Sequence, residues 1–210
     1  MMNSLYAVIV SYLIGSIPTA FIFGKIFKNI DIRQHGSGNV GATNVFRVLG
    51  KTPGMIVLAL DIIKGIIPVV LVADIFGLVE PLQRILLAFC AVAGHNWTIF
   101  LRFKGGKGVA TSLGVLIGLT IKIAGLRLVL LATVLLWAFT FLITGFVSVS
   151  SLVAAVALPI AMVVAAQSLE LVAMGVVFCF FIVFRHKGNI SRLLSGQEPR
   201  VNLFSKKNIR

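Results

Sequence analysis

Charge is what this 210-residue chain has least of, and acidic charge is the scarcest. Only 12% of its residues are charged, about half the share typical of globular proteins, whereas 59% are apolar. Such a composition cannot cover an apolar core with water-facing side chains, which excludes a free soluble enzyme, a disordered chain and a collagen-like scaffold. The sequence therefore predicts an all-α polytopic membrane protein.

Acidic residues number six against nineteen basic ones, giving a formal net charge of +13. This imbalance predicts anionic partners. The basic residues lie between apolar runs, where a nucleic acid could not dock, so lipid headgroups and phosphorylated substrates are predicted instead. So few carboxylates cannot form a paired-carboxylate metal site, and neither a metal nor a cofactor is expected.

Cysteine is almost absent as well. Cys90 and Cys179 lie within apolar segments, with no CxxC pattern and no histidine at ligand spacing. A disulfide framework and a zinc site are therefore not expected, and we interpret both residues as packing residues.

Long apolar runs, in contrast, are abundant. A helix needs about 20 apolar residues to cross the roughly 30 Å hydrocarbon layer. Seven candidate runs cover residues 4–24, 54–73, 82–101, 108–121, 127–144, 148–166 and 169–185. The first run lacks the basic leader and small-residue exit of a cleaved signal peptide, so it is predicted to be a span. The fourth is short and follows a glycine-rich turn, as expected for a half-buried helix aimed at a ligand.

The basic residues indicate the orientation. Fifteen of the nineteen fall in segments 25–51, 102–107 and 185–210. Because short cytoplasmic loops retain lysine and arginine, these segments and the C-terminus are predicted to face the cytoplasm and the N-terminus to lie outside.

Opposite locations of the two ends require an odd number of spans, which seven satisfies. Five spans, with 108–121 or 148–166 re-entrant, would satisfy it too. The predicted organisation is one membrane domain over residues 1–198 and a disordered basic cytoplasmic tail at 199–210.

The first basic segment contains a glycine-rich stretch at 35–47. Residues 36–41 match G-x-G-x-x-G, but no apolar strand precedes them, so a dinucleotide-binding fingerprint is excluded. Glycines allow backbone N–H groups to converge, while neutral side chains and one arginine add donors. The stretch predicts an oxyanion-binding loop, with a capped turn before a short helix as the alternative. Its candidate residues are Ser37, Gly38, Asn39, Thr43, Asn44 and Arg47.

The second basic segment interleaves glycines with lysines. It is not a Walker A loop, because Leu101 replaces the first glycine and Gly108 the required serine or threonine. The glycines open directly into the short helix, which brings backbone N–H groups, a positive helix end and two ammonium groups together. This predicts a phosphate site, with a basic loop touching anionic headgroups as the alternative. Its candidate residues are Lys104, Gly105, Gly106, Lys107 and Gly108.

The third basic segment contains His186, Asn189 and Arg192 at three-residue spacing, which places them on one face if the stretch is helical. A juxtamembrane basic tail is the commoner origin of such a pattern. The spacing alone therefore indicates a site only weakly.

Polar and small residues also occur within the apolar runs. Asp61 and Lys64 lie one turn apart, and a functional role and a mutual ion pair are equally compatible with that spacing. Ser148 could contact a ligand, although capping of the following helix is favoured. Gly114 and Gly118 form the small-xxx-small pattern of close helix packing.

Together the three basic segments resemble the three cytoplasmic motifs of the bacterial acyl-phosphate:glycerol-3-phosphate acyltransferases, the PlsY family. The matching residues are Ser-Gly-Asn-Val-Gly-Ala-Thr-Asn at 37–44 with Arg47, Gly94-His95 with Phe-Lys-Gly-Gly-Lys-Gly-Val-Ala-Thr at 103–111, and Arg185-His186 with Asn189, Arg192, Gly196 and Glu198. The resemblance runs from about residue 5 to residue 198. Thr98 replaces a proline of the family pattern, which affects how the chain enters the second loop.

The resemblance implies a seven-helix enzyme of the bacterial inner membrane with its active site facing the cytoplasm. It would transfer a fatty acyl group from acyl phosphate to the 1-hydroxyl of glycerol 3-phosphate, giving lysophosphatidic acid and phosphate for phospholipid synthesis. By this analogy the first motif helps to hold acyl phosphate, the second forms a phosphate-binding loop and the third completes the pocket.

The predicted site follows from these motifs. Catalytic roles are expected for His186, Ser37 and Asn39. Substrate binding is expected for Gly38, Thr43, Asn44, Arg47, Lys104, Gly105, Gly106, Lys107, Gly108, Thr111, Ser148, Asn189, Arg192 and Glu198. Supporting roles are expected for Asp61, Lys64 and His95.

The chemistry can be argued without the family. No histidine is followed five residues later by an aspartate, so the His-x4-Asp dyad of other acyltransferases is missing. An acyl phosphate is already activated, and an enzyme need only bring two anions together and stabilise the carbonyl oxyanion. We expect direct transfer, with the departing phosphate oxygen, or less favourably His186, accepting the hydroxyl proton.

An organophosphate or phosphate carrier is the alternative function, because a half-helix and a basic pocket also serve transport. A carrier needs access from both sides, and the predicted outward loops contain no glycine-rich motif. An enzyme is therefore favoured. Its expected partners are the two substrates and membrane lipids, and a monomer is expected.

Overall fold

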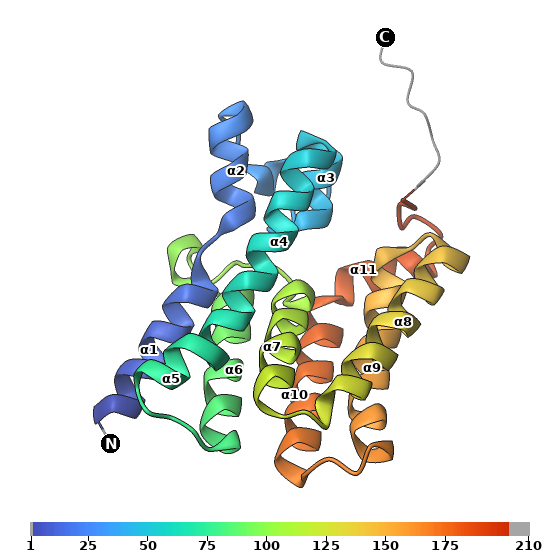
Figure 1. The fold of residues 1–210 in the computed structure, drawn as a ribbon. Helices are drawn as coiled ribbons and strands as arrows, with labels where there is room; N and C mark the ends of the chain where they lie inside the picture. Colours follow the sequence, from blue (N-terminus) through green and yellow to red (C-terminus); the bar gives the residue numbers. More distant parts are fainter. Residues whose placement is uncertain (1, 202–210) are drawn as a thin grey trace.

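The structure is a computed structural model that describes residues 2–201, and within that range every regular element is a helix. The longer helices are α1 (Met2–Ser16), α2 (Thr19–Lys28), α3 (Ala42–Leu49), α4 (Lys51–Ile67), α6 (Pro81–Asn96), α7 (Val109–Lys122), α8 (Leu126–Thr144), α9 (Val147–Val164), α10 (Leu169–Arg185) and α11 (Lys187–Leu194). The short ones are η1 (Ile32–Gln34), η2 (Pro68–Val72), α5 (Ala73–Ile75) and η3 (Ile99–Leu101). The all-α prediction is confirmed (Figure 1). The predicted disordered tail lies largely outside the described residues.

All seven predicted apolar runs are helical, but they differ in length. Five stretches are long and apolar enough to cross a membrane: Met2–Lys28, Lys51–Ile75, Pro81–Leu101, Leu126–Thr144 and Val147–Val164. The pair α10 and α11, bent by 58°, would make a sixth. Helix α7 has 14 residues, about 21 Å at the helical rise per residue, and falls short of the hydrocarbon layer. The prediction that this helix is short is confirmed. The prediction of seven full spans is not, because the described residues contain five candidate spans, or six if the bent pair counts as one.

Neighbouring helices approach closely at glycines. Helix α1 packs against α6, α4 against α7, and α9 against both α8 and α10 (Figure 1). A Cβ atom on Gly15 would overlap the carbonyl oxygen of Ala91, and one on Gly114 would overlap the carbonyl oxygen of Ile62. Gly114 is therefore the packing residue that the small-xxx-small pattern predicts.

A buried polar cluster holds the break between α1 and α2. The chain leaves helical geometry at Ile17 and Pro18, where proline lacks an N–H donor. Lys64 Nζ donates to the carbonyl oxygen of Ile17 at 2.9 Å and lies 2.7 Å from Asp61 Oδ1. Thr19 Oγ1 donates to the same carboxylate oxygen at 2.6 Å. The lysine and aspartate side chains, 6% and 2% exposed, thus form a satisfied ion pair, which favours the structural interpretation.

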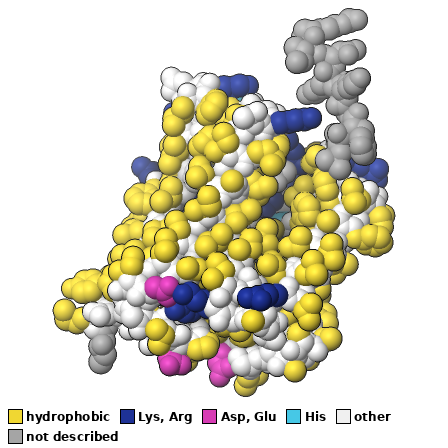
Figure 2. All heavy atoms as spheres, in the orientation of Figure 1, with side chains coloured by type: hydrophobic (Ala, Val, Ile, Leu, Met, Phe, Trp, Pro, Cys, Tyr) yellow, Lys and Arg dark blue, Asp and Glu magenta, His cyan; other side chains and the backbone are white. Residues whose placement is uncertain are grey.

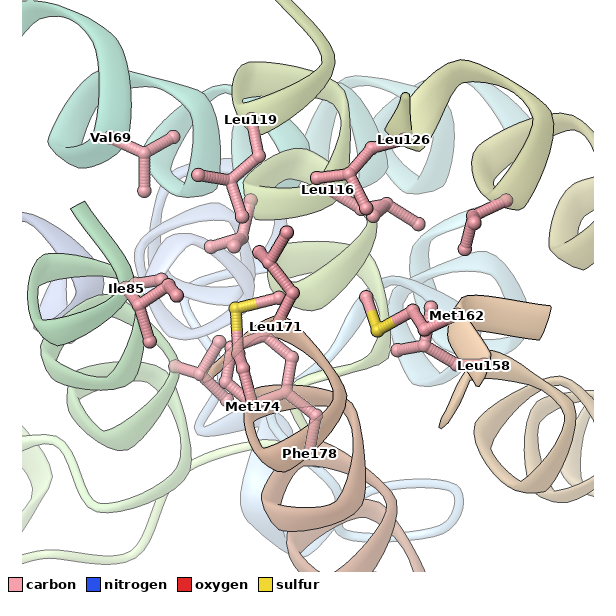
Figure 3. Packing of buried hydrophobic residues seen from close by; sticks show 14 of the residues in the cluster. Val69, Ile85, Leu116, Leu119, Leu126, Leu158, Met162, Leu171, Met174 and Phe178 are labelled. Carbon is pink, nitrogen blue, oxygen red and sulfur yellow. The ribbon is translucent and has the colours of Figure 1, made fainter. Parts of the chain in front are cut away.

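The main apolar core lies among η2 and the helices α6, α7, α8, α9 and α10 (Figure 3). Its largest members include Leu119, Met162, Met174 and Phe178, all with almost no exposed surface. Outside this core, many large apolar side chains are exposed, and they cover much of the face in Figure 2. An exposed apolar surface of this extent is what a lipid-facing bundle requires.

Candidate active site

The three basic segments, distant in sequence, meet near one end of the bundle. Helix α3, the loop before α7, and α11 all lie toward that end (Figure 1). Arg185, at the end of α10, donates through Nε to the Gly106 carbonyl at 2.9 Å and through Nη2 to the Gly105 carbonyl at 2.7 Å. Arg47 on α3 donates to the carbonyl oxygen of Pro199 at 3.4 Å. The third segment therefore contacts both of the others.

A continuous chain of polar side chains joins the second and third segments. Lys107 Nζ donates to Asn189 Oδ1, and Asn189 Nδ2 donates to Glu198 Oε1 at 2.6 Å. Arg192 Nε donates to the other carboxylate oxygen at 2.8 Å. The Glu198 carboxylate thus orients Arg192 directly and Lys107 through Asn189. Two positive charges face one negative charge, so the group as a whole is positively charged. The predicted common face of Asn189 and Arg192 on a helix is confirmed.

Glu198 is ionised in this setting. Its burial acts to raise its pKa, but the hydrogen bonds from Asn189 and Arg192 outweigh burial and hold the pKa below its ordinary value. Ser148 lies beside this carboxylate, buried near the start of α9. No side chain caps α9, so the favoured capping role of Ser148 is wrong.

Lys107 carries a perturbed charge. Burial is the largest influence and, together with the positive charges of Arg192, Arg47 and Arg185, it lowers the pKa of Lys107 to about 8, although Glu198 acts in the opposite direction. Several cations held around one partly dehydrated space favour a bound anion, because a phosphate would relieve their mutual repulsion.

This titration predicts a pH dependence. In the free protein Lys107 loses its proton above about pH 8, so kcat/KM for an anionic substrate is expected to decline there. Lys107→Arg, which stays charged over the whole range, should move the decline to higher pH. The measurement is kcat/KM from pH 6 to pH 10 for both proteins, and an unshifted alkaline limb in the arginine variant would assign the titration to another group.

The glycine loop has a different role from the predicted one. Gly105 N–H donates to the Asn96 carbonyl at 3.1 Å and Gly106 N–H to the His95 carbonyl at 3.0 Å. These two donors are therefore engaged and do not point at a phosphate. A Cβ atom on Gly106 would overlap His95 Nε2 and lie 2.7 Å from the Val40 carbonyl oxygen. Glycine is needed here for close packing of the loop between the first segment and α6.

Backbone donors for an anion remain at the start of α7. The first N–H groups of a helix have no intrahelical acceptor, and in α7 they follow Gly108, whose φ of +79° lies in the left-handed region. Lys107 stands immediately before them. The predicted convergence of a positive helix end and an ammonium group is thus present, with one lysine rather than two.

Three buried side chains at or next to this helix end make no side-chain hydrogen bond with any residue between 2 and 201. They are Asn96, through both amide atoms, and the predicted Thr111 and its neighbour Ser112, through their hydroxyl groups. A Cβ atom on Gly108 would lie 2.8 Å from Asn96 Oδ1. Asn96 was not among the residues predicted from the sequence. The available signal was a polar amide directly after His95, within the apolar run 82–101.

Lys104 does not join the polar chain. Its side chain is exposed and lines another cavity with Arg33 and Arg102. The expectation that it contacts the same phosphate as Lys107 is therefore corrected. Only Gly105 and Gly106 separate the two lysines, and the hydrogen bonds that hold these glycines direct the two side chains to different places.

Asn44 shapes the first segment instead of facing a ligand. Its Nδ2 donates to the carbonyl oxygens of Ile32 and His35 at 3.1 and 3.0 Å, and its Oδ1 accepts from Ser37 N–H at 2.8 Å. Gly36, at φ +61°, passes so close that a Cβ atom would overlap Asn44 Oδ1. Asn44 is therefore a positioning residue for the loop, which corrects its predicted ligand contact.

The other predicted residues of the first segment remain accessible. Ser37 is exposed, whereas Gly38, Asn39 and Thr43 are half-buried. Gly38, at φ +70°, adopts a conformation that glycine favours. Their proposed contacts with substrate stay predictions.

His186 lies at the bend between α10 and α11 and is buried. Its Nδ1 is 2.7 Å from the Ile182 carbonyl oxygen, and because a carbonyl only accepts, Nδ1 carries the proton. In the neutral ring Nε2 is then an acceptor. The histidine lies close enough to Lys107 and Glu198 to interact electrostatically with both.

His95 supports the loop from the side of α6. Its Nδ1 lies 3.8 Å from Asp61 Oδ1, and its ring and carbonyl both contact the glycine loop. The buried pair of Asp61 and Lys64 thus connects through His95 to the site. This arrangement agrees with supporting roles for all three residues.

Comparison with known proteins identifies the family. The family model described as glycerol-3-phosphate acyltransferase matches residues 5–196. The chain belongs to this family. The resemblance noted in the three basic segments is confirmed.

The relatives of this acyltransferase chain match it over nearly its whole length. A glycerol-3-phosphate acyltransferase of Fusobacterium nucleatum subsp. nucleatum is 44% identical over 92% of this chain and 95% of its own. That of Endomicrobium trichonymphae is 40% identical over 99% of this chain and 100% of its own.

Solved structures agree with the sequence comparison. The crystal structure of PlsY, an integral membrane glycerol 3-phosphate acyltransferase, in its glycerol 3-phosphate form has a TM-score of 0.85 at 39% identity, covering 95% of this chain and 96% of that one. The lysophosphatidic acid form has a TM-score of 0.82 at 38% identity, covering 95% of each chain. With the apolar helices described above, this makes the chain a multi-pass membrane protein of the acyltransferase family.

Proposed function

We propose that this chain transfers the acyl group of an acyl phosphate to the 1-hydroxyl of glycerol 3-phosphate, forming lysophosphatidic acid and phosphate. The observation that carries the proposal is the polar chain of Lys107, Asn189, Glu198 and Arg192 beside the start of α7. Lys107, Arg192 and the nearby Arg47 give this region three positive charges against the single carboxylate of Glu198. Both proposed substrates carry a phosphate, so a site with this charge balance suits them.

The proposed reaction is a direct displacement. The 1-hydroxyl oxygen attacks the acyl carbon, the bond between that carbon and the phosphate oxygen breaks, and the hydroxyl proton passes to the departing phosphate. The cations hold the two anions together and stabilise the oxyanion that develops on the carbonyl. His186, with Nε2 able to accept, is the less favoured proton acceptor.

The proposed location is the bacterial inner membrane, with the N-terminus outside and the site facing the cytoplasm. Met2 and the end of α11 lie at opposite ends of the bundle (Figure 1), and α11 shares its end with the basic segments. Lysine and arginine concentrate on cytoplasmic loops, which supports this orientation. Because one chain supplies all three segments, we propose that it acts as a monomer.

The donor is tested directly. Purified protein in detergent should form lysophosphatidic acid from palmitoyl phosphate and glycerol 3-phosphate and release one phosphate per product, whereas palmitoyl-CoA should give none. When both substrate concentrations are varied, double-reciprocal plots of the initial rates should give intersecting lines, because direct transfer needs both substrates bound at once. Use of palmitoyl-CoA alone would refute the acyl-phosphate donor, and uptake of labelled glycerol 3-phosphate into sealed vesicles without product would indicate a carrier.

A further inference from the structure

A basic cavity lies outside the polar chain described above. It has a volume of about 460 Å³ and opens between α2, η1 and η3. Its lining residues are Phe21, Arg33, Phe100, Leu101, Arg102 and Lys104. Half of the lining is cationic and half is apolar, which is unlike the polar site around Lys107.

The charge of this cavity is only partly balanced. Arg33 binds Asp31 through Nη2 at 2.6 Å and through Nε at 2.9 Å, and its guanidinium lies 5.3 Å from the centre of the Phe21 ring. These contacts fix Arg33 and neutralise it. Arg102 and Lys104 form no ion pair with any of residues 2–201. Two positive charges therefore remain for an anion.

The backbone of the η3 turn presents these cations together with aromatic rings. Arg102 and Phe103 have φ values of 55° and 60°, a backbone conformation that residues other than glycine rarely adopt. The Phe103 N–H donates to the Thr98 carbonyl at 2.8 Å and holds the turn. Phe100 and Phe103 are 58% and 57% exposed. Aromatic and basic side chains on one surface turn of a membrane protein are typical of the headgroup region.

We propose that this cavity binds the phosphate headgroup of an anionic membrane lipid. Arg102 and Lys104 contact the phosphate, while Phe21 and Phe100 pack against the glycerol backbone and the first methylene groups. The apolar half of the lining favours a lipid over a free phosphate ion, because a hydrated ion gains nothing from contact with phenyl rings. This site is separate from the proposed transfer reaction and does not depend on it.

Photochemical labelling tests the proposal. The full chain is placed in phosphatidylcholine nanodiscs that contain a small fraction of a photoactivatable phosphatidylglycerol, and labelling of the peptide covering residues 99–104 is measured by mass spectrometry. We expect labelling there that unlabelled phosphatidylglycerol suppresses and inorganic phosphate does not. Arg102→Ala and Lys104→Ala should each lower it about fivefold, as expected for one cation near a lipid surface.

Matched variants keep the test decisive if folding is affected. Lys104→Arg retains the charge and should retain the labelling. Arg127→Ala removes an exposed cation from the first turn of α8 and should leave the labelling unchanged. The thermal unfolding midpoint of each variant is recorded in parallel. Labelling that is equal in the wild type and in well-folded Lys104→Ala would overturn the proposal, and so would suppression by inorganic phosphate as strong as that by the lipid.

Discussion

Lys107→Met is expected to lower kcat/KM for acyl transfer by about 10²- to 10³-fold, the loss typical of removing one preorganised electrostatic group from an active site. In the structure this lysine contacts Asn189, which in turn binds Glu198. The substitution removes the cation that the glycine loop places at the start of α7. It also leaves the charge of Glu198 opposed by one fewer cation, which disfavours a second anion.

The same loop supplies the comparison. Lys104→Met removes an identical charge three positions away in the sequence, but the Lys104 side chain lines the cavity between α2, η1 and η3. With a short-chain soluble donor, the decrease in kcat/KM of this variant should therefore be much smaller. Arg127→Met is the neutral control, because that exposed side chain lies in the first turn of α8. Both substrates are varied at pH 7, and unfolding midpoints confirm that each variant folds. Equal losses of activity at the two lysines would contradict the separation of the Lys104 cavity from the polar chain of Lys107.

The positions of the helices were predictable because apolar run length is a local property. All seven apolar runs are helical, and the shortness of α7 followed from the charge and glycine that bound it. The break between α1 and α2 falls inside the first predicted run, at Pro18. Its geometry depends on Lys64 and Thr19 contacting residues more than forty positions away, and no local pattern contains that information.

The residues of the site were predictable by type but not by partner. Asn189, Arg192 and Glu198 meet Lys107 as the motifs suggested. The N–H groups of Gly105 and Gly106 were expected to bind phosphate, yet the carbonyl groups at the end of α6 already accept them. A sequence shows that a donor exists and not which acceptor is nearest. For the same reason, Lys104 and Lys107, which lie in one loop, were both predicted to bind the same phosphate.

Lys64→Met is expected to lower the free energy of unfolding by about 3–5 kcal/mol, the range found when one partner of a buried ion pair is removed. The substitution removes the ammonium group that lies 2.7 Å from Asp61 Oδ1, so the Asp61 carboxylate, which is 2% exposed, stays buried without a counter-charge. It also removes the hydrogen bond to the Ile17 carbonyl at the break between α1 and α2. Unfolding in mixed detergent micelles, followed by circular dichroism, measures the loss.

A double variant distinguishes a structural pair from a functional one, which the spacing of Asp61 and Lys64 could not do. Asp61→Leu combined with Lys64→Met buries no charge and should recover much of the stability, because apolar replacement of both partners is far less costly than loss of one. If the pair acts only through structure, the folded double variant keeps a kcat close to that of the wild type. A stable double variant with a kcat as low as that of Lys107→Met would instead show that the pair acts on the reaction through His95, whose ring joins Asp61 to the glycine loop.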